Sequence, residues 1–251
     1  MIEAKNINKS YGSKKVVDNV SFKIEEGKIT SFIGPNGAGK STVLSMISRL
    51  LDADSGEVFI DGKEIKDWNS KDLSKKLSIL KQSNTLNIRL TIRELVSFGR
   101  FPYCEGKLKK EDEKFVDDAL NYMQLTDIQD KYLDELSGGQ KQRAYIAMIL
   151  AQDTDYILLD EPLNNLDMKH SAEMMKMLRQ MVNDFGKTII IVIHDINFAS
   201  CYSDNIVALK DGKLVKHTTT EDMITENNLS CLYDMNFNIR EVNNQKICIY
   251  F

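Results

Sequence analysis

Alternating hydrophobic and polar positions dominate the first quarter of the chain and predict short β-strands separated by turns. The pair Asp61-Gly62 follows the last of these segments and favours a tight hairpin turn. The expected strands are Met1 to Ile7, Val20 to Ile24, Lys28 to Ile33 and Glu57 to Ile60. We therefore expect a β-rich start with an antiparallel component.

A helical period replaces this alternation at two places. From Lys40 to Leu51 the apolar residues recur at helical spacing, directly after a glycine-rich loop. From Thr91 to about Ala151 strand patterns are missing altogether, which indicates an inserted helical subdomain. The helices expected within it are Thr91 to Gly99, Glu111 to Met123 and Gly139 to Leu150.

Strand and helix patterns alternate again after the helical insertion. This alternation is typical of a mostly parallel sheet covered by helices. The expected elements are strand Tyr156 to Leu159, helix Lys169 to Phe185, strand Thr188 to Ile193, helix Asp195 to Ser203 and strand Asn205 to Leu209. The tail from Glu221 to Phe251 resembles one short helix with one or two strands, which is too small for a separate regulatory domain.

Composition narrows the class of protein. The 251 residues are 42% hydrophobic, which suits one compact unit, and Lys+Arg 33 against Asp+Glu 37 gives a net charge of -4 and argues against nucleic acid. The longest aliphatic run, Ile189 to Ile193, is too short to cross a bilayer, so a membrane role would need a partner. Four distant cysteines favour reduced thiols; they are Cys104, Cys201, Cys231 and Cys248.

The glycine-rich loop matches the phosphate-binding pattern G-x-x-x-x-G-K-[ST]. It lies between an apolar strand and a helix, where backbone N–H groups and the helix dipole favour an anion. In this pattern Lys40 supplies a cation for the β- and γ-phosphates of a nucleotide, and Ser41 offers a hydroxyl to Mg²⁺. The matching residues are Gly34, Pro35, Asn36, Gly37, Ala38, Gly39, Lys40 and Ser41, with Thr42 next.

Two adjacent carboxylates, Asp160 and Glu161, follow the apolar run Tyr156 to Leu159. Such a pair is costly at a strand end unless a cation compensates, and a phosphate-bound Mg²⁺ would do so. Asp160 is then the metal-side acid, and Glu161 is placed to polarise the water that attacks the γ-phosphate. Taken alone, the pair would equally suit an ordinary polar strand end before Pro162.

The string Leu136-Ser137-Gly138-Gly139-Gln140 is identical to the signature of ABC ATPases, and the order of motifs resembles that family across essentially the whole chain. Physically, Ser137 can cap the following helix while the two glycines expose N–H groups at its positive end. The resemblance implies an α/β fold of the P-loop NTPase, RecA-like type, with a mostly parallel sheet, an N-terminal antiparallel β subdomain and the inserted helical subdomain.

The same resemblance implies a head-to-tail homodimer that forms in the presence of nucleotide. ATP would lie between the cradle of one subunit, residues 34 to 42, and the signature of the other, residues 137 to 140. Expected subdivisions of this single ABC ATPase domain, residues 1–251, are 1–88 and 155–220 for the nucleotide-binding core, 89–154 for the helical signature subdomain and 221–251 for a short extension.

Other positions are similar to family motifs residue by residue. Tyr11 resembles the aromatic residue that stacks on adenine, Gln82 the glutamine that contacts Mg²⁺ and water, and His194 the histidine that contacts the γ-phosphate. Each would otherwise be an ordinary strand-end or surface residue. Asn165 to Asp167 corresponds to the loop that links two active sites. Leu163 and Asn164 depart from the usual Thr and Ser, which puts no catalytic residue in doubt.

A standalone cassette of this size is more similar to importer subunits than to exporters, translation factors or DNA-repair ATPases. The resemblance implies integral membrane permease subunits, an extracytoplasmic substrate-binding protein and a place at the cytoplasmic face of the cell membrane. The stretches Thr91 to Tyr103 and Glu161 to His170 resemble ferric-siderophore ATPases of the petrobactin and anguibactin branch. Haem, cobalamin or another metal chelate, and a non-transport ATPase, remain alternatives. Candidate permease contacts are Arg100, Phe101 and Tyr103.

Overall fold

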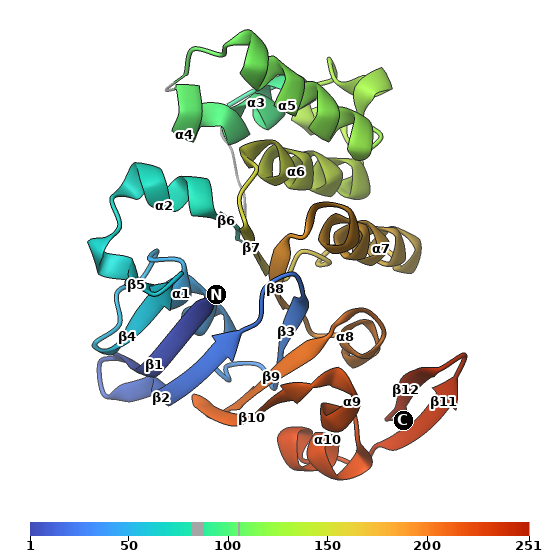
Figure 1. The fold of residues 1–251 in the computed structure, drawn as a ribbon. Coiled ribbons are helices and arrows are strands. Elements are labelled where there is room, and N and C mark those ends of the chain that lie inside the picture. The colour runs from blue at the N-terminus through green and yellow to red at the C-terminus, as the bar shows by residue number, and fades with distance from the viewer. Residues whose placement is uncertain (82–87, 105, 251) are drawn as a thin grey trace. The chain divides into compact units, whose positions relative to one another are not determined.

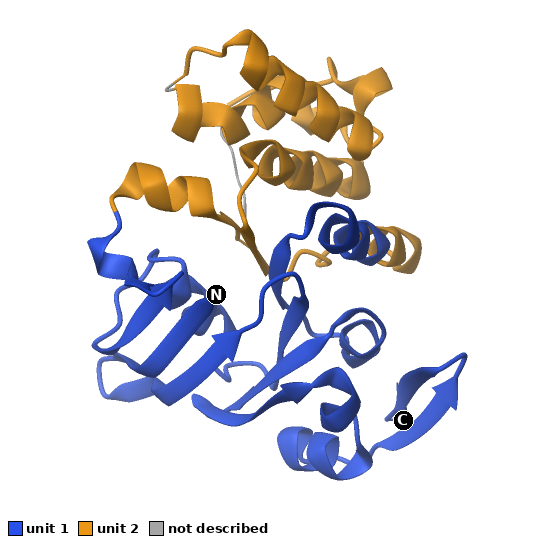
Figure 2. Ribbon diagram, viewed as in Figure 1, with its two compact units in different colours: residues 1–68, 175–251 blue, residues 69–174 orange. Residues whose placement is uncertain are grey.

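The computed structural model describes residues 1–81, 88–104 and 106–250. These divide into two compact units, shown in different colours in Figure 2. Unit 1 comprises Met1–Trp68 and Met175–Phe251, and unit 2 comprises Asn69–Met174. The second boundary falls inside one helix, α7 (Met168–Phe185). The subdivision expected at residues 89, 154 and 221 concerns functional segments and stays a prediction.

Unit 1 begins with an antiparallel sheet of strand order β2-β1-β4-β5. Ile2 and Ala4 of β1 alternate into the core, and Ile7 is buried again after a register shift between Ala4 and Ile7. The Asp61-Gly62 turn has both residues at positive φ, 51° and 78°, as a tight hairpin requires. The β-rich start is thus confirmed, with longer strands than expected: β1 (Ile2–Tyr11), β2 (Lys14–Ile24), β4 (Ser55–Ile60) and β5 (Lys63–Glu64).

A second sheet in unit 1 carries strands in the order β10-β9-β3-β8. β9, β3 and β8 are parallel, and β10 joins β9 in antiparallel fashion through the Asp211-Gly212 turn. Every residue of β3 and β8 is buried, which suits their mainly apolar sequences; the polar exceptions are Thr30, Ser31 and Thr188. The strands are β3 (Ile29–Ile33), β8 (Thr188–Val192), β9 (Asn205–Lys210) and β10 (Lys213–Thr219).

The first helix of unit 1, α1 (Lys40–Ile47), is shorter than the sequence pattern indicates. The prediction that it continues to Leu51 is wrong, because Arg49 adopts a left-handed conformation with φ 59°. The N–H groups of Leu50 and Leu51 instead both donate to the carbonyl of Ser45, and the Arg49 guanidinium donates to the carbonyls of Ile65 and Trp68. A single 3₁₀ turn, Ile65–Asp67, lies beside this point.

The tail contains the two strands that the sequence allowed for, paired as a hairpin, and two short helices where one was expected. The hairpin turns at Asn243 and Asn244, both at positive φ. It packs on α8, where the Asn197 side chain accepts from the N–H of Cys248 at 2.7 Å and donates to its carbonyl at 3.2 Å. The elements are α8 (Ile196–Tyr202), α9 (Thr220–Met223), α10 (Glu226–Tyr233), β11 (Asn238–Val242) and β12 (Gln245–Ile249).

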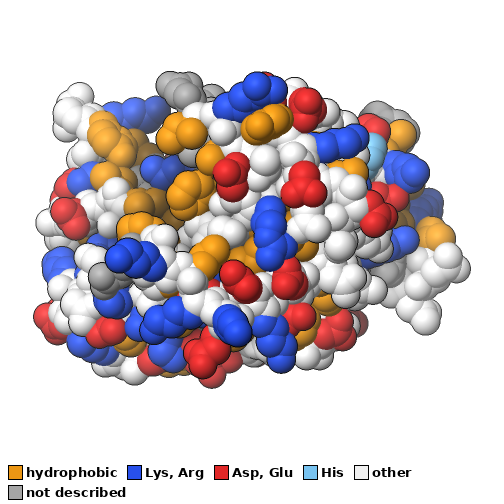
Figure 3. Space-filling view, turned by 90° about the horizontal axis from the view of Figure 1, so that it is seen from above, with side chains coloured by type: hydrophobic (Ala, Val, Ile, Leu, Met, Phe, Trp, Pro, Cys, Tyr) orange, Lys and Arg blue, Asp and Glu red, His pale blue; other side chains and the backbone are white. Residues whose placement is uncertain are grey.

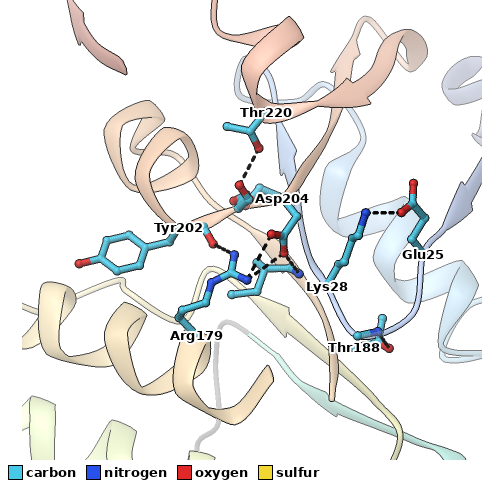
Figure 4. A network of polar contacts seen from close by, with 11 residues as sticks. Glu25, Lys28, Arg179, Thr188, Tyr202, Asp204 and Thr220 are labelled. Carbon is cyan, nitrogen blue, oxygen red and sulfur yellow. Dashed lines mark hydrogen bonds and ion pairs between the residues drawn. The ribbon is translucent and has the colours of Figure 1, made fainter. Parts of the chain in front are cut away.

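A polar network fixes the amino end of β3 in unit 1, as Figure 4 shows. The Asp204 carboxylate accepts from the N–H of Ile29 at 2.8 Å and from the Arg179 guanidinium at 3.0 Å. Arg179 also donates to the carbonyl of Tyr202, and the Thr220 hydroxyl donates to the carbonyl of Ser203 at 2.8 Å. These contacts anchor β3, α8, β9 and the second half of α7 at one end of the sheet.

In its described residues, unit 2 is helical apart from one parallel pair of strands, β6 and β7. Among the described residues from Thr91 to Ala151 there is no strand, as expected, although α2 and β6 before this region were not expected. Its elements are α2 (Ser70–Lys76), β6 (Leu77–Leu80), α3 (Ile92–Ser97), α4 (Phe101–Cys104), α5 (Lys110–Tyr122), α6 (Gly138–Gln152), β7 (Tyr156–Asp160) and the 3₁₀ turns Phe98–Arg100, Thr126–Ile128 and Leu133–Glu135. No helix in the described ranges has the length and apolar character needed to span a membrane.

Candidate functional site

The glycine-rich loop of unit 1 connects the end of β3 to the start of α1, the arrangement expected of a phosphate cradle. Gly39 forms the N-cap of α1 with φ 96°, and a Cβ there would lie 2.6 Å from the carbonyl oxygen of Val16. Asn36 and Gly37 at the tip of the loop are exposed. The loop therefore presents an accessible backbone next to the positive end of a helix, which suits an anion.

Lys40 lies under this loop and is 5% exposed. Its Nζ donates to the carbonyl of Gly34 at 2.7 Å and to that of Pro35 at 3.0 Å. Ser41 and Thr42 are half-buried in the first turn of α1. The start of α1 thus carries the Lys40 cation and the hydroxyls of Ser41 and Thr42 directly after the loop.

The register of unit 1 places His194 at the same sheet edge as the cradle. Phe32 of β3 is paired with Val192 of the adjacent parallel strand β8. Gly34 lies two residues after Phe32 and His194 lies two residues after Val192, so both lie at the carboxyl ends of neighbouring strands. Hydrogen-bonded strands lie about 4.8 Å apart, and carboxyl ends of parallel strands are where ligands bind in such sheets. His194 is exposed there, and Tyr11 at the end of β1 is 54% exposed.

In unit 2 the two carboxylates Asp160 and Glu161 follow a fully buried stretch of β7, as expected. Glu161 has φ 51°, a left-handed conformation that costs a non-glycine residue about 1–2 kcal/mol. Its carboxylate accepts from the Asn164 side chain at 2.5 Å. Backbone strain of this kind concentrates at functional positions, and no pattern in the sequence indicates it.

The signature string of unit 2 starts α6 with a reciprocal cap. The Ser137 hydroxyl accepts from the N–H of Gln140 at 3.3 Å, and the Gln140 side chain accepts from the N–H of Ser137 at 3.0 Å. The prediction that Ser137 caps this helix is confirmed. Ser137 and Gly138 are exposed, so the positive end of a 15-residue helix is open to solvent.

The signature also touches the start of α7 within unit 2. A Cβ at Gly139 would lie 2.6 Å from the ring of His170, whose Nδ1 lies 2.8 Å from the Asp167 carboxylate. Hydrogen bonding by the backbone N–H of His170 lowers the pKa of Asp167. Gly138 and Glu161 line one pocket of about 180 Å³. Gln82, the remaining site residue expected from the sequence, lies outside the described residues.

Comparison with known proteins identifies the family. The family model described as ABC transporter matches residues 17–164, which is more than half of the chain. The chain belongs to the ABC transporter family. This ABC protein is 62% identical, over 251 residues and 100% of both chains, to the petrobactin import ATP-binding protein YclP of Bacillus subtilis (strain 168). It is 48% identical to FatE of Bacillus anthracis, a petrobactin import ATP-binding protein, over 95% of this chain and 96% of that one.

A solved structure of the ATP-binding cassette MJ0796, a post-hydrolysis dimer bound to ADP and Pi, has the same fold. Its TM-score is 0.77 at 34% identity, and the match covers 88% of this ABC protein and 99% of that chain. The predicted family and fold class are therefore confirmed, and the protein is an ATPase of this family. The family model includes the cradle, the signature and the two carboxylates, whereas Tyr11 and His194 lie beyond its limits.

Two residues that contact the candidate site in this ABC protein were not predicted from the sequence, His170 beside Gly139 and Tyr233 beside Gly34. The spacing Asp167-x-x-His170 at the start of α7 is a helix-cap pattern that could have pointed to His170. No pattern in the sequence could have indicated Tyr233, because it lies 199 residues from Gly34, its hydrogen-bond partner, and belongs to no motif.

An apolar face distinguishes unit 2 of this ABC protein. Phe98 and Phe101 are 49% and 57% exposed, and both line two pockets of about 750 and 500 Å³. Figure 3 shows hydrophobic side chains gathered among charged ones on the left of its view. Arg100 is a wrong contact candidate, because it is 4% exposed and its Nε is paired with Asp112 at 3.0 Å. Tyr103 is half-buried, with its ring 3.9 Å from the Arg100 guanidinium.

Proposed function

We propose that this protein is the ATP-hydrolysing subunit of an importer that takes up a ferric siderophore of the petrobactin class through a separate membrane permease. The observation that carries the proposal is the 62% identity, over the full length of both chains, to a petrobactin import ATP-binding protein. Ferric hydroxamate and ferric enterobactin proteins are related less closely, at 39% and 37% identity. The siderophore class thus follows the relatives with the highest identity among these.

The residues of the cradle supply the binding chemistry in this proposal. Backbone N–H groups between Gly34 and Thr42 hold the phosphates, and Lys40 exchanges its carbonyl partners for β- and γ-phosphate oxygens. His194 contacts the γ-phosphate, and Tyr11 stacks on adenine with its exposed ring. Glu161 polarises the attacking water, with Gln82 assisting, and its fixed backbone limits the directions its carboxylate can take.

The side chains fit Mg²⁺ through their oxygen donors. Ser41 offers a hydroxyl in the first turn of α1, and Asp160 offers a carboxylate at the end of β7. Magnesium prefers such hard oxygen ligands and is commonly held by one or two of them together with substrate phosphates. When bound, the ion would neutralise charge on the β- and γ-phosphates.

A second copy of the chain completes the site in this proposal. The capped and exposed start of α6, Ser137 to Gln140, offers a positive helix end that ATP bound to another copy can contact. The related cassette MJ0796 is dimeric with ADP and Pi bound. Loss of the γ-phosphate then removes the charge that both copies hold, and the dimer opens.

The permease is proposed to contact the apolar face of unit 2 that includes Phe98 and Phe101. Exposed aromatic side chains beside apolar pockets are typical of protein interfaces. An extracytoplasmic substrate-binding protein would deliver the siderophore to the permease. The place of this chain is then the cytoplasmic face of the membrane.

The decisive experiment is uptake of radioactive iron, supplied as several ferric siderophores, in cells whose chromosomal copy carries Glu161→Gln. We expect uptake of one siderophore class to be lost. The purified variant should bind ATP as a stable dimer and hydrolyse it at least about 100-fold more slowly than wild type. Glu173→Gln on α7 is the matched control and should leave uptake unchanged.

Two results would contradict the proposal. Undiminished uptake of every siderophore, with the variant protein present and no redundant ATPase, would direct attention to another metal chelate or to a role outside transport. Normal ATP turnover by Glu161→Gln would remove Glu161 from the chemistry.

A further inference from the structure

Gly34, the first residue of the cradle, is held from three sides within unit 1. Its N–H donates to the Tyr233 hydroxyl at 3.1 Å, and its carbonyl accepts from Lys40 Nζ at 2.7 Å. A Cβ at this position would lie 1.9 Å from the carbonyl oxygen of Leu209. With φ 140°, Gly34 has a conformation in which only glycine is comfortable, and its position depends on these neighbours.

Tyr233 reaches the cradle from the C-terminal part of the chain. It is the last residue of α10, and Asp234 ends that helix in a left-handed conformation. Lys210 at the end of β9 donates to the carbonyl of Cys231 at 2.8 Å and to the Asp234 carboxylate at 2.7 Å. The backbone around Tyr233 is therefore anchored to the same strand that confines Gly34 through Leu209.

The ring of Tyr233 belongs to a row of three aromatic side chains. Its centroid lies 5.9 Å from that of Phe237, which lies 5.7 Å from that of Tyr250 beyond the β11–β12 hairpin. Phe237 is 7% exposed. Burial raises the pKa of Tyr233 to about 12, so the hydroxyl facing Gly34 stays protonated and neutral at physiological pH.

We propose that Tyr233 is a positioning residue for nucleotide binding, through which the C-terminal segment holds the phosphate cradle in its binding conformation. This inference rests on the proposed ATPase function. An unpaired Gly34 N–H would leave the first residue of the cradle less constrained, and phosphate binding would then have to order it. Ordering that is completed before the ligand arrives strengthens binding without changing the chemical step.

The test is the variant Tyr233→Phe, which keeps the ring and removes only the hydroxyl. We expect KM for ATP to rise about three- to tenfold, with kcat within about twofold of wild type. Affinity for a fluorescent ADP analogue, measured without turnover, should fall by the same factor. Phe237→Leu leaves the hydroxyl in place but loosens the ring, and is expected to raise KM by a smaller factor.

Tyr202→Phe is the matched control. Tyr202 lies on α8 in unit 1, and within the described part of the chain its hydroxyl makes no hydrogen bond (Figure 4). Its kinetics should equal those of wild type. If Tyr233→Phe and Tyr202→Phe have equal KM for ATP and equal affinity for the analogue, the inference about Tyr233 is overturned. Hydrolysis of ATP by the wild-type protein would in that case still support the ATPase function. A wild-type protein that binds the analogue but hydrolyses no ATP would overturn the proposed function, and analogue affinity alone would then decide the role of Tyr233.

Discussion

The two ends of β3 in unit 1 are held in different ways. At the amino end, Asp204 pairs with Arg179 and accepts from the N–H of Ile29, so charges meet opposite charges. At the carboxyl end, Gly34 contacts a neutral tyrosine hydroxyl, and the Lys40 cation donates to backbone carbonyls. A charge that must later bind phosphate is better held by weak neutral partners that it can exchange, whereas a purely structural end gains from an ion pair.

The largest expected effect is on ATP hydrolysis, and it should differ between two lysines, Lys40 after the carboxyl end of β3 and Lys28 before its amino end. Lys40→Ala should lower kcat/KM for ATP by about 100-fold or more, because it removes the cation that the phosphates need. Lys28→Ala, before the amino end, removes a lysine paired with Glu25 at the surface and should leave hydrolysis unchanged. Steady-state hydrolysis with purified proteins measures both. Normal turnover of Lys40→Ala would overturn the cradle assignment.

A smaller effect, on stability rather than catalysis, is expected at the amino end. Asp204→Ala removes the ion pair with Arg179 and the acceptor for Ile29, and should lower the free energy of unfolding by about 1–2 kcal/mol after allowance for its partial exposure. Melting would then fall by about 2–8 °C, with kcat of the folded fraction unchanged. Glu25→Ala, an exposed acid in the same region (Figure 4), serves as control. An Asp204→Ala protein that lost turnover but not stability would reverse the comparison.

The smallest expected effect is on the pH dependence of stability, and it concerns His217 on β10. Burial against the core lowers the pKa of His217, whose ring contacts Phe22 at 6.5 Å between centroids. Below the unfolded pKa of 6.5 the unfolded chain binds the proton more readily than the folded one, so stability should fall as pH drops from about 7 towards 5. Chemical denaturation at several pH values should show a weaker pH dependence for His217→Gln. If the free energy of unfolding changes with pH equally in wild type and His217→Gln, the pH dependence arises from other groups.

Local patterns were enough to predict most of the strands, the glycine-rich loop between strand and helix, and the capped signature helix, because each depends on neighbours in the chain. Ile29–Ile33 is fully buried and three of its five residues are large and apolar, and Ser137 and Gln140 cap one helix turn. By contrast, β6 has only four residues and α2 is largely polar, so neither has a clear periodicity. The contact between Tyr233 and Gly34 and the left-handed backbone of Glu161 arise from tertiary packing, which no local pattern records.

The contact between Gly139 and His170 in unit 2 also constrains how this sequence can evolve. A side chain at position 139 would begin 2.6 Å from the imidazole, too close for any Cβ. We therefore expect the two positions to vary together, because a side chain at position 139 requires the His170 ring to move or to be replaced by a smaller side chain. Selection on the signature would then extend to a residue outside it, at the start of α7.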